Sequence, residues 1–235
     1  MSRTKPPPAV NRLLAALPRV DARRFQANSS PVVLTVGDVL SDIGQPIRHV
    51  YFPTSCLISQ ETSVAGRSSL EVGLIGDEGM LGISLALGIG VSPLGAVVRS
   101  TGSSLRMDNA SFRRELERSK ALRRVLNRYV HVLMGQFAQA AACTRFHVLE
   151  ARLARLLLMT NDRAHSDTFH VTHEVLAHML GVRRVGVTKA ATSLQERDLI
   201  RYRRGNIEIL DRPGLEAASC ACYATDTASY AQMFN

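Results

Sequence analysis

The stretch LAHMLGVRRVGVTKAATSLQERDLIRYRRGN, residues 176–206, alternates apolar residues at helical spacing with a run of cations. Apolar side chains fall on one face of a helix over 175–180 and again over 182–194. Thr172 can cap the first helix, because a short side-chain oxygen accepts from the free amides of the first turn. Gly181 can end that helix, because glycine adopts a positive φ at low steric cost. A second helix that begins within about three residues is typical of a helix-turn-helix unit.

Cations gather at the start of the second helix. Arg183, Arg184, Thr188 and Lys189 lie within its first turn and a half, and the last three lie on or near one face. In a helix-turn-helix unit, the N-terminal residues of the second helix point toward the bases of the major groove. Guanidinium groups suit guanine edges and phosphates, whereas lysine acts more as a point charge. We therefore expect these four residues to contact DNA.

A basic hairpin follows the second helix. Apolar residues alternate on both sides of RRGN, residues 203–206, which predicts two strands joined by a turn at Gly205-Asn206. Arg203 and Arg204 would stand at the tip of this wing and contact phosphate. From the turn of the helix pair to this tip, seven Lys or Arg face only two acidic residues. The alternative is a solvated charged face, but the coincidence of turn, caps, cations and wing favours nucleic acid.

The composition agrees with a folded protein that has a polyanionic partner. The chain has 235 residues, of which 46% are hydrophobic and 21% charged, and its formal net charge is +9. Such a balance favours nucleic acid or an anionic membrane surface. The uncharged stretch Gly79–Val98 is long enough to span a bilayer, but five glycines and Pro93 interrupt it, so short strands and turns are the better interpretation. We expect no membrane helix.

The N-terminal segment and the cysteines indicate the compartment. The opening MSRTKPPPAV has cations but no apolar core behind them, so we expect no secretory signal. The cysteines Cys56, Cys143, Cys220 and Cys222 are scattered, or too close together to form an easy bridge. This usage suits a reducing cytoplasm.

The first half of the chain has the pattern of a β domain. Residues 1–30 are typical of a loose arm with one short helix at about 11–17. From Pro31 onward, short apolar runs alternate with glycine-containing turns about every ten residues, and no helical period appears before residue 110. This spacing predicts an antiparallel barrel or sandwich.

A long helical tract follows the predicted strands. Asp108 or Asn109 can cap a helix that begins near Ser111 and runs through about Cys143. Its apolar stripe advances by alternating steps of four and three, which is the seam of a coiled coil and favours pairing with a second copy of the chain. The alternative is a helix that packs on its own β domain. The predicted dimer-interface residues are Leu122, Leu126, Tyr129, Leu133, Gln136 and Ala140, with Cys143 continuing the stripe.

At this point the chain resembles the Crp–Fnr superfamily of bacterial transcription regulators over nearly its whole length. The similarity lies in the order of parts: a β domain with VGDVL and VYFP near its start, a long dimer helix and a winged helix-turn-helix. The stretch THEVLAHMLGVRRVGVTKAATSLQERDLI, residues 172–200, resembles that family's DNA-binding signature in register.

The resemblance implies an α+β fold in three parts. An N-terminal antiparallel β-barrel of the cyclic-nucleotide-binding-like jelly-roll type would span 1–117, a dimerisation helix 118–144, and a winged helix-turn-helix DNA-binding domain with a C-terminal tail 145–235. By position, Thr172 and His173 would contact phosphate. The three base-facing positions would hold Arg184, Val185 and Lys189. The family often has an acid where Val185 stands, so its common DNA site is not implied; valine could touch only a thymine methyl or pack inward.

The resemblance also bears on what the β domain senses. Relatives that bind cyclic nucleotides use a Gly-Glu pair for the ribose, and an Arg followed by Ser or Thr for the phosphate. Here Ile83 stands after Gly82, and Leu94-Gly95 stand where the Arg and Ser would be. A buried phosphate without a cation or many N–H donors is costly, so we expect no cyclic AMP binding.

Metal and catalytic sites find little support in the sequence. Cys220-Ala-Cys222 resembles half a metal site, but no second cysteine pair or close histidine accompanies it in the sequence. His165, His170, His173 and His178 are unevenly spaced around the start of a predicted helix. We predict no metal and no cofactor. Neither a G-x-S-x-G motif, nor a P-loop, nor HExxH occurs, so we predict no catalytic residues and no enzyme activity.

The leading hypothesis is a cytoplasmic, homodimeric transcription regulator that binds a near-palindromic site on double-stranded DNA. RNA polymerase is a further candidate partner, and the effector stays unassigned. The rival hypothesis is a ligand-receptor or scaffold module whose helix-turn-helix mediates protein contacts.

Overall fold

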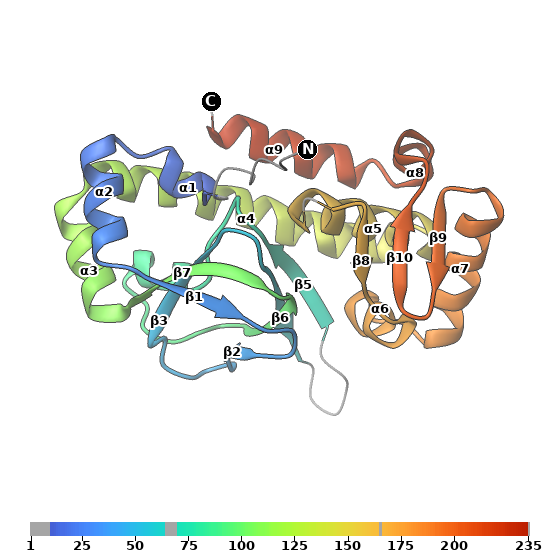
Figure 1. Cartoon of the computed structure of the whole chain (residues 1–235), viewed down its shortest axis with the longest axis horizontal. Coiled ribbons are helices and arrows are strands. Elements are labelled where there is room, and N and C mark those ends of the chain that lie inside the picture. Colours follow the sequence, from blue (N-terminus) through green and yellow to red (C-terminus); the bar gives the residue numbers. More distant parts are fainter. Residues whose placement is uncertain (1–9, 64–69, 165, 235) are drawn as a thin grey trace, which may run out of the picture.

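The computed structural model of the chain describes residues 10–63, 70–164 and 166–234. Figure 1 shows two lobes joined by the long helix α4, Lys120–Phe146, which passes behind the strands in that view. The N-terminal lobe is built mainly from strands, and the C-terminal lobe combines helices with a small sheet. The predicted α+β fold and the predicted order of parts are confirmed.

Two antiparallel sheets form the N-terminal lobe. The first has the order β1-β7-β3 and the second the order β2-β6-β4-β5. A small apolar cluster that includes Tyr51, Ile58 and Val98 draws side chains from both sheets. The sheets remain open and form two layers, which is the sandwich of the two expected alternatives, barrel or sandwich. The strands are β1 Ser30–Leu34, β2 Val39–Ser41, β3 His49–Pro53, β4 Leu57–Thr62, β5 Leu70–Ile75, β6 Gly95–Ser100 and β7 Gly102–Asp108.

The uncharged stretch 79–98 forms turns and a strand, as predicted. A 3-10 helix, η1 Ile83–Leu87, lies between Gly82 and Gly88, whose φ angles are +91° and +80°. Strand β6 follows after the loop 88–94. Across the described residues, no helix combines the length and the apolar character that crossing a membrane requires.

The N-terminal arm is more ordered than the sequence predicts. Helix α1, Arg12–Ala15, confirms the expected short helix, and the side chain of Asn11 caps it. A second helix, α2 Arg19–Ala27, was not predicted. Its Arg24 donates to the buried carboxylate of Glu115 at 2.9 Å, and its Phe25 is buried. These tertiary contacts hold a segment whose own sequence is mostly polar.

The long helical tract breaks once. Helix α3, Asn109–Arg118, is capped by Asp108, and α4 begins after Ser119. The Ser119 hydroxyl accepts from the backbone N–H of Leu122 at 3.0 Å and donates to Asp21 at 3.0 Å. A serine that bonds to the backbone in this way competes with helix continuation. The expectation of one continuous helix from near Ser111 was therefore wrong at Ser119.

The apolar stripe of α4 is buried inside the protomer itself. Tyr129 is 0% exposed, and its hydroxyl donates to the carbonyl of Met80 at 3.4 Å. Helix α4 packs against α1, η1 and β5. The predicted dimer-interface residues thus lie mainly in the protomer's own core. This burial corrects their assignment to a dimer interface. Buried on α4 are Leu122, Leu126, Tyr129, Leu133, Gln136 and Cys143, with Ala140 half-buried.

The C-terminal tail forms a helix, α9 Cys222–Phe234, that packs against α4. Helix α9 lies along α4 in Figure 1 and runs antiparallel to it, because Tyr230 donates to Gln136 while the earlier Cys222 accepts from the later Gln139. The ring of Phe234 lies 4.3 Å from the guanidinium carbon of Arg12. The remaining elements are α5 Leu149–Ala164, β8 Thr168–His170, α6 His173–Leu180, α7 Arg184–Glu196, β9 Ile200–Arg203, β10 Asn206–Ile209, α8 Arg212–Ala218 and α9 Cys222–Phe234.

Candidate nucleic-acid interface

Helices α6 and α7 form the predicted helix-turn-helix unit. The Thr172 hydroxyl accepts from the backbone N–H of Val175 at 3.3 Å and caps α6. Gly181 ends α6 with a φ of +64°, and Val182 donates back to the carbonyl of Ala177 at 3.0 Å. Both the cap and the turn glycine are confirmed. The turn is short because the left-handed residue reverses the chain at once.

Helix α7 buries one face and exposes the other. Val187, Ala191 and Leu194 are buried in the C-terminal core. Val185 is 65% exposed, so it does not pack inward. A small apolar side chain in this position can contact a thymine methyl but can form no hydrogen bond with a base. Exposed along the outer face are Arg183, Arg184, Val185, Thr188 and Lys189.

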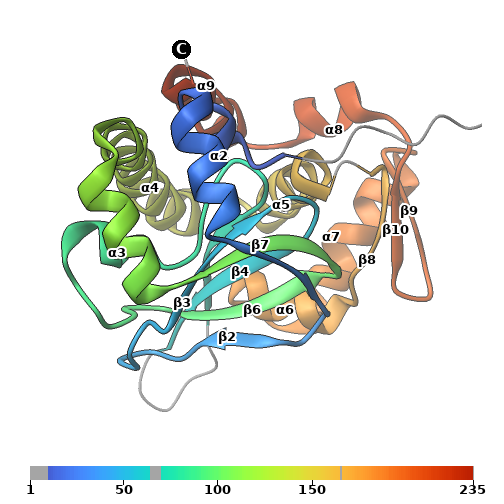
Figure 2. The same cartoon turned by 60° about the vertical axis from the view of Figure 1, so that its left-hand side comes forward.

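Strands β9 and β10 form the predicted wing, which Figure 2 shows at the outer edge of the molecule. Asn206 pairs with Arg203, so the turn residues are Arg204 and Gly205, with φ angles of +51° and +82°. The expected turn at Gly205-Asn206 was one residue too late. A two-residue hairpin of this kind needs positive φ at both central positions. Arg203 and Arg204 are exposed at the tip.

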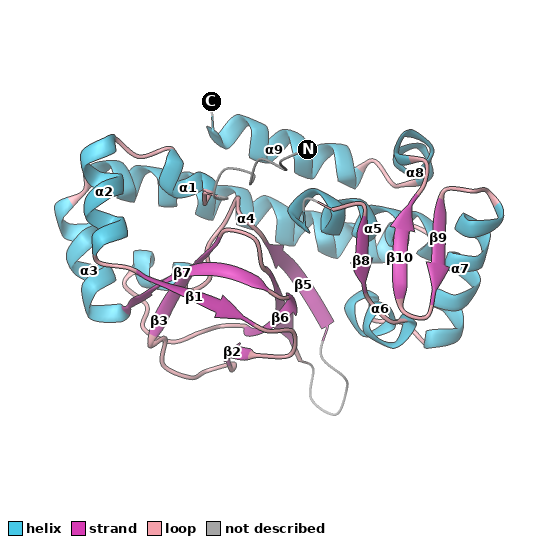
Figure 3. Ribbon diagram, viewed as in Figure 1, coloured by secondary structure: helices cyan, strands magenta, loops and turns pink. Residues whose placement is uncertain are grey.

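A third strand completes the small sheet shown in Figure 3. Strand β8 pairs with β10, and the sheet order is β8-β10-β9. The sequence did not indicate this strand, because it is only three residues long and follows a polar segment. It anchors the wing to the start of the helix-turn-helix unit.

His173 joins three elements of the site. Its ring stacks on that of Tyr202 from β9, with centroids 4.1 Å apart, and its Nδ1 lies 3.1 Å from the Thr188 hydroxyl on α7. Burial lowers the pKa of His173, and the nearby charge of Arg184 lowers it further. Both effects favour the neutral form of the ring. Its Nδ1 is engaged by the Thr188 hydroxyl and its Nε2 is buried without a hydrogen-bond partner, so neither nitrogen faces an approaching phosphate in this arrangement.

The cations of the interface are free to meet a ligand. On the outer surface, Arg197 pairs with Glu150 at 3.0 Å and Arg201 with Glu208 at 2.7 Å. Within the described part of the chain, no ion pair engages the five predicted DNA-contacting cations. An exposed cation without an acidic neighbour keeps its full charge for an approaching polyanion. These five residues are Arg183, Arg184, Lys189, Arg203 and Arg204.

The β lobe touches the helix-turn-helix unit directly. A Cβ atom on Gly181 would lie 2.7 Å from Cδ1 of Leu70, so these two positions are in close contact. The His178 ring on α6 lies 3.5 Å from a carboxylate oxygen of Glu61 on β4. A rearrangement of β4 and β5 would therefore change the contacts at the turn between α6 and α7.

The structure carries no cation at the positions expected to hold a cyclic nucleotide. Ile83 is the first residue of η1 and packs on the apolar core. Leu94 offers its backbone carbonyl to the Ser92 hydroxyl at 2.7 Å, and Gly95 opens β6. The Tyr129 hydroxyl packs closely against the backbone of Gly79. A Cβ atom on Gly79 would lie 2.5 Å from this hydroxyl.

One cluster was missed at the sequence level. Cys143, His147, Cys220 and Cys222 offer ligand atoms that all lie within 4.8 Å of one another. The statement that no close histidine accompanies Cys220 and Cys222 was therefore wrong in space. A Cys-x₃-His spacing at the end of a helix was the available signal, but its partners are about 75 residues away along the chain. His170, His173 and His178 do not join this cluster, and His165 lies outside the described residues.

The comparisons with known proteins agree with this geometry. Residues 151–218 match the family model of the Crp-like helix-turn-helix domain. No curated protein matches the sequence significantly.

Solved structures extend the similarity to nearly the whole chain. FixK2 from Bradyrhizobium japonicum has a TM-score of 0.70 at 13% identity, over 82% of this chain and 98% of its own. A CRP/FNR-family transcriptional regulator from Thermus thermophilus scores 0.63 at 20% identity, over 81% and 98%. The c-di-GMP-responsive global regulator of Xanthomonas campestris scores 0.64 at 14% identity, over 83% and 100%. At these identities the similarity establishes the fold.

The family model identifies the C-terminal domain, and the solved structures match the fold of the longer chain. The C-terminal part of the chain is a Crp-like helix-turn-helix domain, and it is joined to a β lobe and long helix arranged as in the Crp/Fnr regulators. Residues 151–218 are thus a Crp-like helix-turn-helix domain, and most of the chain shares the fold of a solved CRP/FNR-family transcriptional regulator.

Proposed function

We propose that the chain binds a specific, near-palindromic DNA site as a homodimer in the cytoplasm. The observation that carries this proposal is the set of five exposed cations without ion pairs on the face of α7 and the tip of the wing. Arg184 and Lys189 on α7 are positioned to read bases, with Val185 between them. Arg203 and Arg204 on the wing are positioned to hold phosphate.

A second face of α4 supports the homodimer. The stretch Val132–Thr144 contains no charged residue, although its outer half faces solvent. Met134 is 67% exposed, and Ala138 and Ala142 are exposed on the same face. His131 and Arg145 extend the same exposed face at both ends, and the steps along it are three, four, four and three residues. A two-fold dimer through this face would place two recognition helices on related half-sites.

The same proposal excludes cyclic AMP as the effector. Ile83, Leu94 and Gly95 provide no charge for a phosphate, and no acid follows Gly82 to hold a ribose. Contact with RNA polymerase remains a prediction from the family resemblance.

Selection of bound sequences from random duplexes by the purified protein tests the proposal. We expect a motif with dyad symmetry whose half-sites lie about one helical turn apart. A salt titration on the selected duplex should show affinity that falls steeply with salt, because each phosphate contact releases counterions. Absent or salt-independent binding would favour the rival, a module whose helix-turn-helix contacts protein.

A further inference from the structure

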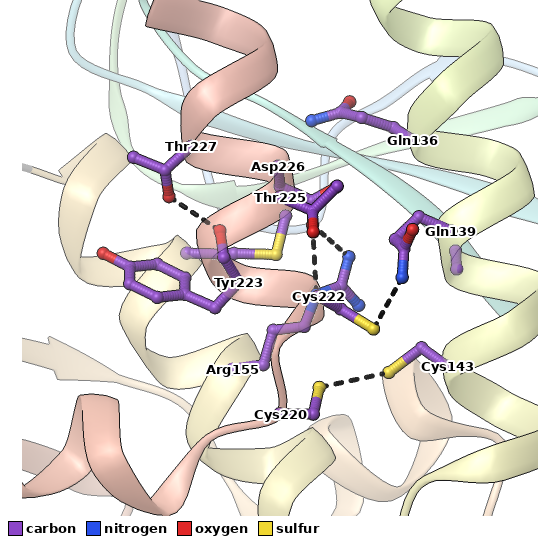
Figure 4. A network of polar contacts seen from close by, with 12 residues as sticks. Gln136, Gln139, Cys143, Arg155, Cys220, Cys222, Tyr223, Thr225, Asp226 and Thr227 are labelled. Atoms are coloured by element: carbon purple, nitrogen blue, oxygen red, sulfur yellow. Dashed lines mark hydrogen bonds and ion pairs between the residues drawn. The ribbon is translucent and has the colours of Figure 1, made fainter.

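Four metal-ligating side chains from distant segments meet at the end of α4. Cys143 lies in the last turn of α4, and His147 is the residue that caps it. Cys220 lies in the link between α8 and α9, and Cys222 is the first residue of α9. Figure 4 shows the Cys220 and Cys143 sulfurs pointing toward each other, with Cys222 beside them.

The distances suit a tetrahedral site. The sulfurs of Cys143 and Cys220 are 3.5 Å apart, and the Cys222 sulfur lies 3.4 Å from Nδ1 of His147. All four ligand atoms lie within 4.8 Å of one another. Zinc bonds of about 2.3 Å to sulfur and about 2.0 Å to nitrogen place ligands roughly 3.5–3.8 Å apart in a tetrahedron. Two pairs already have such spacing, and the others need a contraction of about one ångström or less.

The surroundings also fit a bound cation. The three cysteines are buried, and His147 is half-buried. The side-chain amide of Gln139 donates to the Cys222 sulfur at 2.8 Å, which is the kind of outer hydrogen bond that steadies a metal thiolate. Arg155 lies next to the cluster and is paired with Asp226, as Figure 4 shows, so this ion pair adds no net charge beside a site of three thiolates, one imidazole and a divalent ion.

We propose that Cys143, His147, Cys220 and Cys222 bind one zinc ion. Four protein ligands leave no open coordination position, which is typical of a structural site rather than a catalytic one. The ion would fasten α9 to the end of α4, at the junction where the chain turns into α5 and the DNA-binding domain. Binding energy gained only in the folded state then stabilises this junction.

Metal analysis of the full chain tests the proposal. Protein purified under reducing conditions and incubated with zinc should retain about one equivalent after gel filtration. Cobalt loaded in its place should give the intense visible bands of a tetrahedral thiolate site. Cys143→Ser and Cys220→Ser should each abolish stoichiometric retention. Cys56→Ser is the matched control, because Cys56 is also a buried free cysteine but lies in the β lobe.

A measurement on the unaltered protein guards against variants that fail to fold. Zinc should protect three of the four thiols from a thiol reagent, and a chelator should expose them and lower the melting temperature. Loss of about 10–100-fold in zinc affinity is expected for Gln139→Leu, as for other outer-shell partners. A disulfide between Cys143 and Cys220 in protein kept under reducing conditions would overturn the proposal. So would equal zinc retention in Cys220→Ser and Cys56→Ser.

Discussion

At the scale of single residues, the interface separates two kinds of cation. Arg184 stands at the start of α7, where a guanidinium can reach base edges with two parallel hydrogen bonds. Arg204 stands in the wing turn, where its distance from α7 favours the DNA backbone. A base contact carries sequence information, whereas a phosphate contact contributes affinity and salt dependence.

Replacing one cation of each kind should therefore have different effects. Arg184→Ala should cost roughly 1–3 kcal/mol on the preferred site and relax preference at one base pair. Arg204→Asn, which tolerates the positive φ of +51°, should weaken all duplexes alike and reduce the salt slope by about one. Fluorescence anisotropy on matched and mismatched duplexes measures both, with Arg19→Ala on α2 as control. If Arg184→Ala changes nothing while Arg204→Asn alters base preference, α7 is not the reading helix.

A second prediction concerns the carboxyl of Glu71 on β5. Burial raises its pKa to about 8, although the Ser59 hydroxyl donates to it at 2.6 Å and Arg99 and Arg163 lie near enough to oppose the shift. Because the folded pKa exceeds the ordinary value of 4.5, the contribution of this group to stability is fully present below about pH 4.5 and is lost as pH rises through about 8. Glu61 on β4 adds a like charge in the same direction.

Glu71→Gln should remove this pH dependence. Relative to wild type, the variant should gain up to about 1.4 kcal/mol of unfolding free energy for each pH unit between about pH 5 and 8. Urea unfolding at the two pH values measures the difference. Glu117→Gln, on the exposed side of α3, serves as control. A difference between wild type and variant that does not change with pH would contradict the assignment.

At the scale of elements, α4 carries two uncharged stripes on opposite faces, one buried and one exposed. The apolar stripe that includes Leu126 packs into the chain's own core. The opposite stripe through Met134 and Ala138 is uncharged but exposed. Burying it against a second copy would remove apolar surface from water without desolvating any charge between Val132 and Thr144.

An acidic residue on the buried stripe should disrupt folding, whereas an acidic residue on the exposed stripe should disrupt dimerisation alone. Leu126→Asp puts an unpaired charge where exposure is 0%, at a cost of about 3–5 kcal/mol, and should destabilise the fold. Ala138→Glu should leave a folded monomer that binds the selected duplex at least about tenfold more weakly, because one half-site is lost. Sedimentation velocity and melting curves measure the two effects.

The matched control for this pair is Ala228→Glu. Ala228 is an exposed alanine on α9, so it introduces the same charge in a similar helical setting. It should stay dimeric and bind DNA normally. A dimeric Ala138→Glu variant would show that the two copies meet elsewhere.

At the scale of the whole molecule, the β lobe is placed to influence the DNA-binding domain. Leu70 on β5 abuts the turn glycine Gly181, and Glu61 on β4 lies beside His178. A ligand that favoured another arrangement of these strands would shift the helix-turn-helix unit with them. We expect that this ligand is not cyclic AMP, because the lobe carries no charge at Ile83, Leu94 and Gly95.

Cyclic AMP should therefore leave the full chain unchanged. Isothermal calorimetry with about 1 mM nucleotide should give no saturable heat, although a micromolar binder would saturate under these conditions. We expect no binding because Ile83, Leu94 and Gly95 offer no charge to the phosphate of the nucleotide. The selected duplex, titrated into the same protein sample, serves as the positive control. A micromolar dissociation constant for the nucleotide would mean that other groups hold the phosphate.

The sequence by itself determined the features that depend on neighbouring residues. Gly181 ends α6, Thr172 caps it, and the outer face of α7 carries the cations, because turn geometry, caps and helical period are local properties. The predicted turn of the wing was displaced by one residue, at Gly205-Asn206 instead of Arg204-Gly205. Gly205 fits either turn position, and only the pairing of the two strands decides the register.

The tertiary structure alone decided which surfaces meet. The four-and-three stripe of α4 predicted a partner but could not say that α9, η1 and the β lobe supply it, because periodicity records burial and not the identity of what covers it. The same limit hid the cysteine cluster. Cys143 and Cys220 are 77 residues apart in the chain, and only the antiparallel packing of α9 on α4 brings their sulfurs within 3.5 Å.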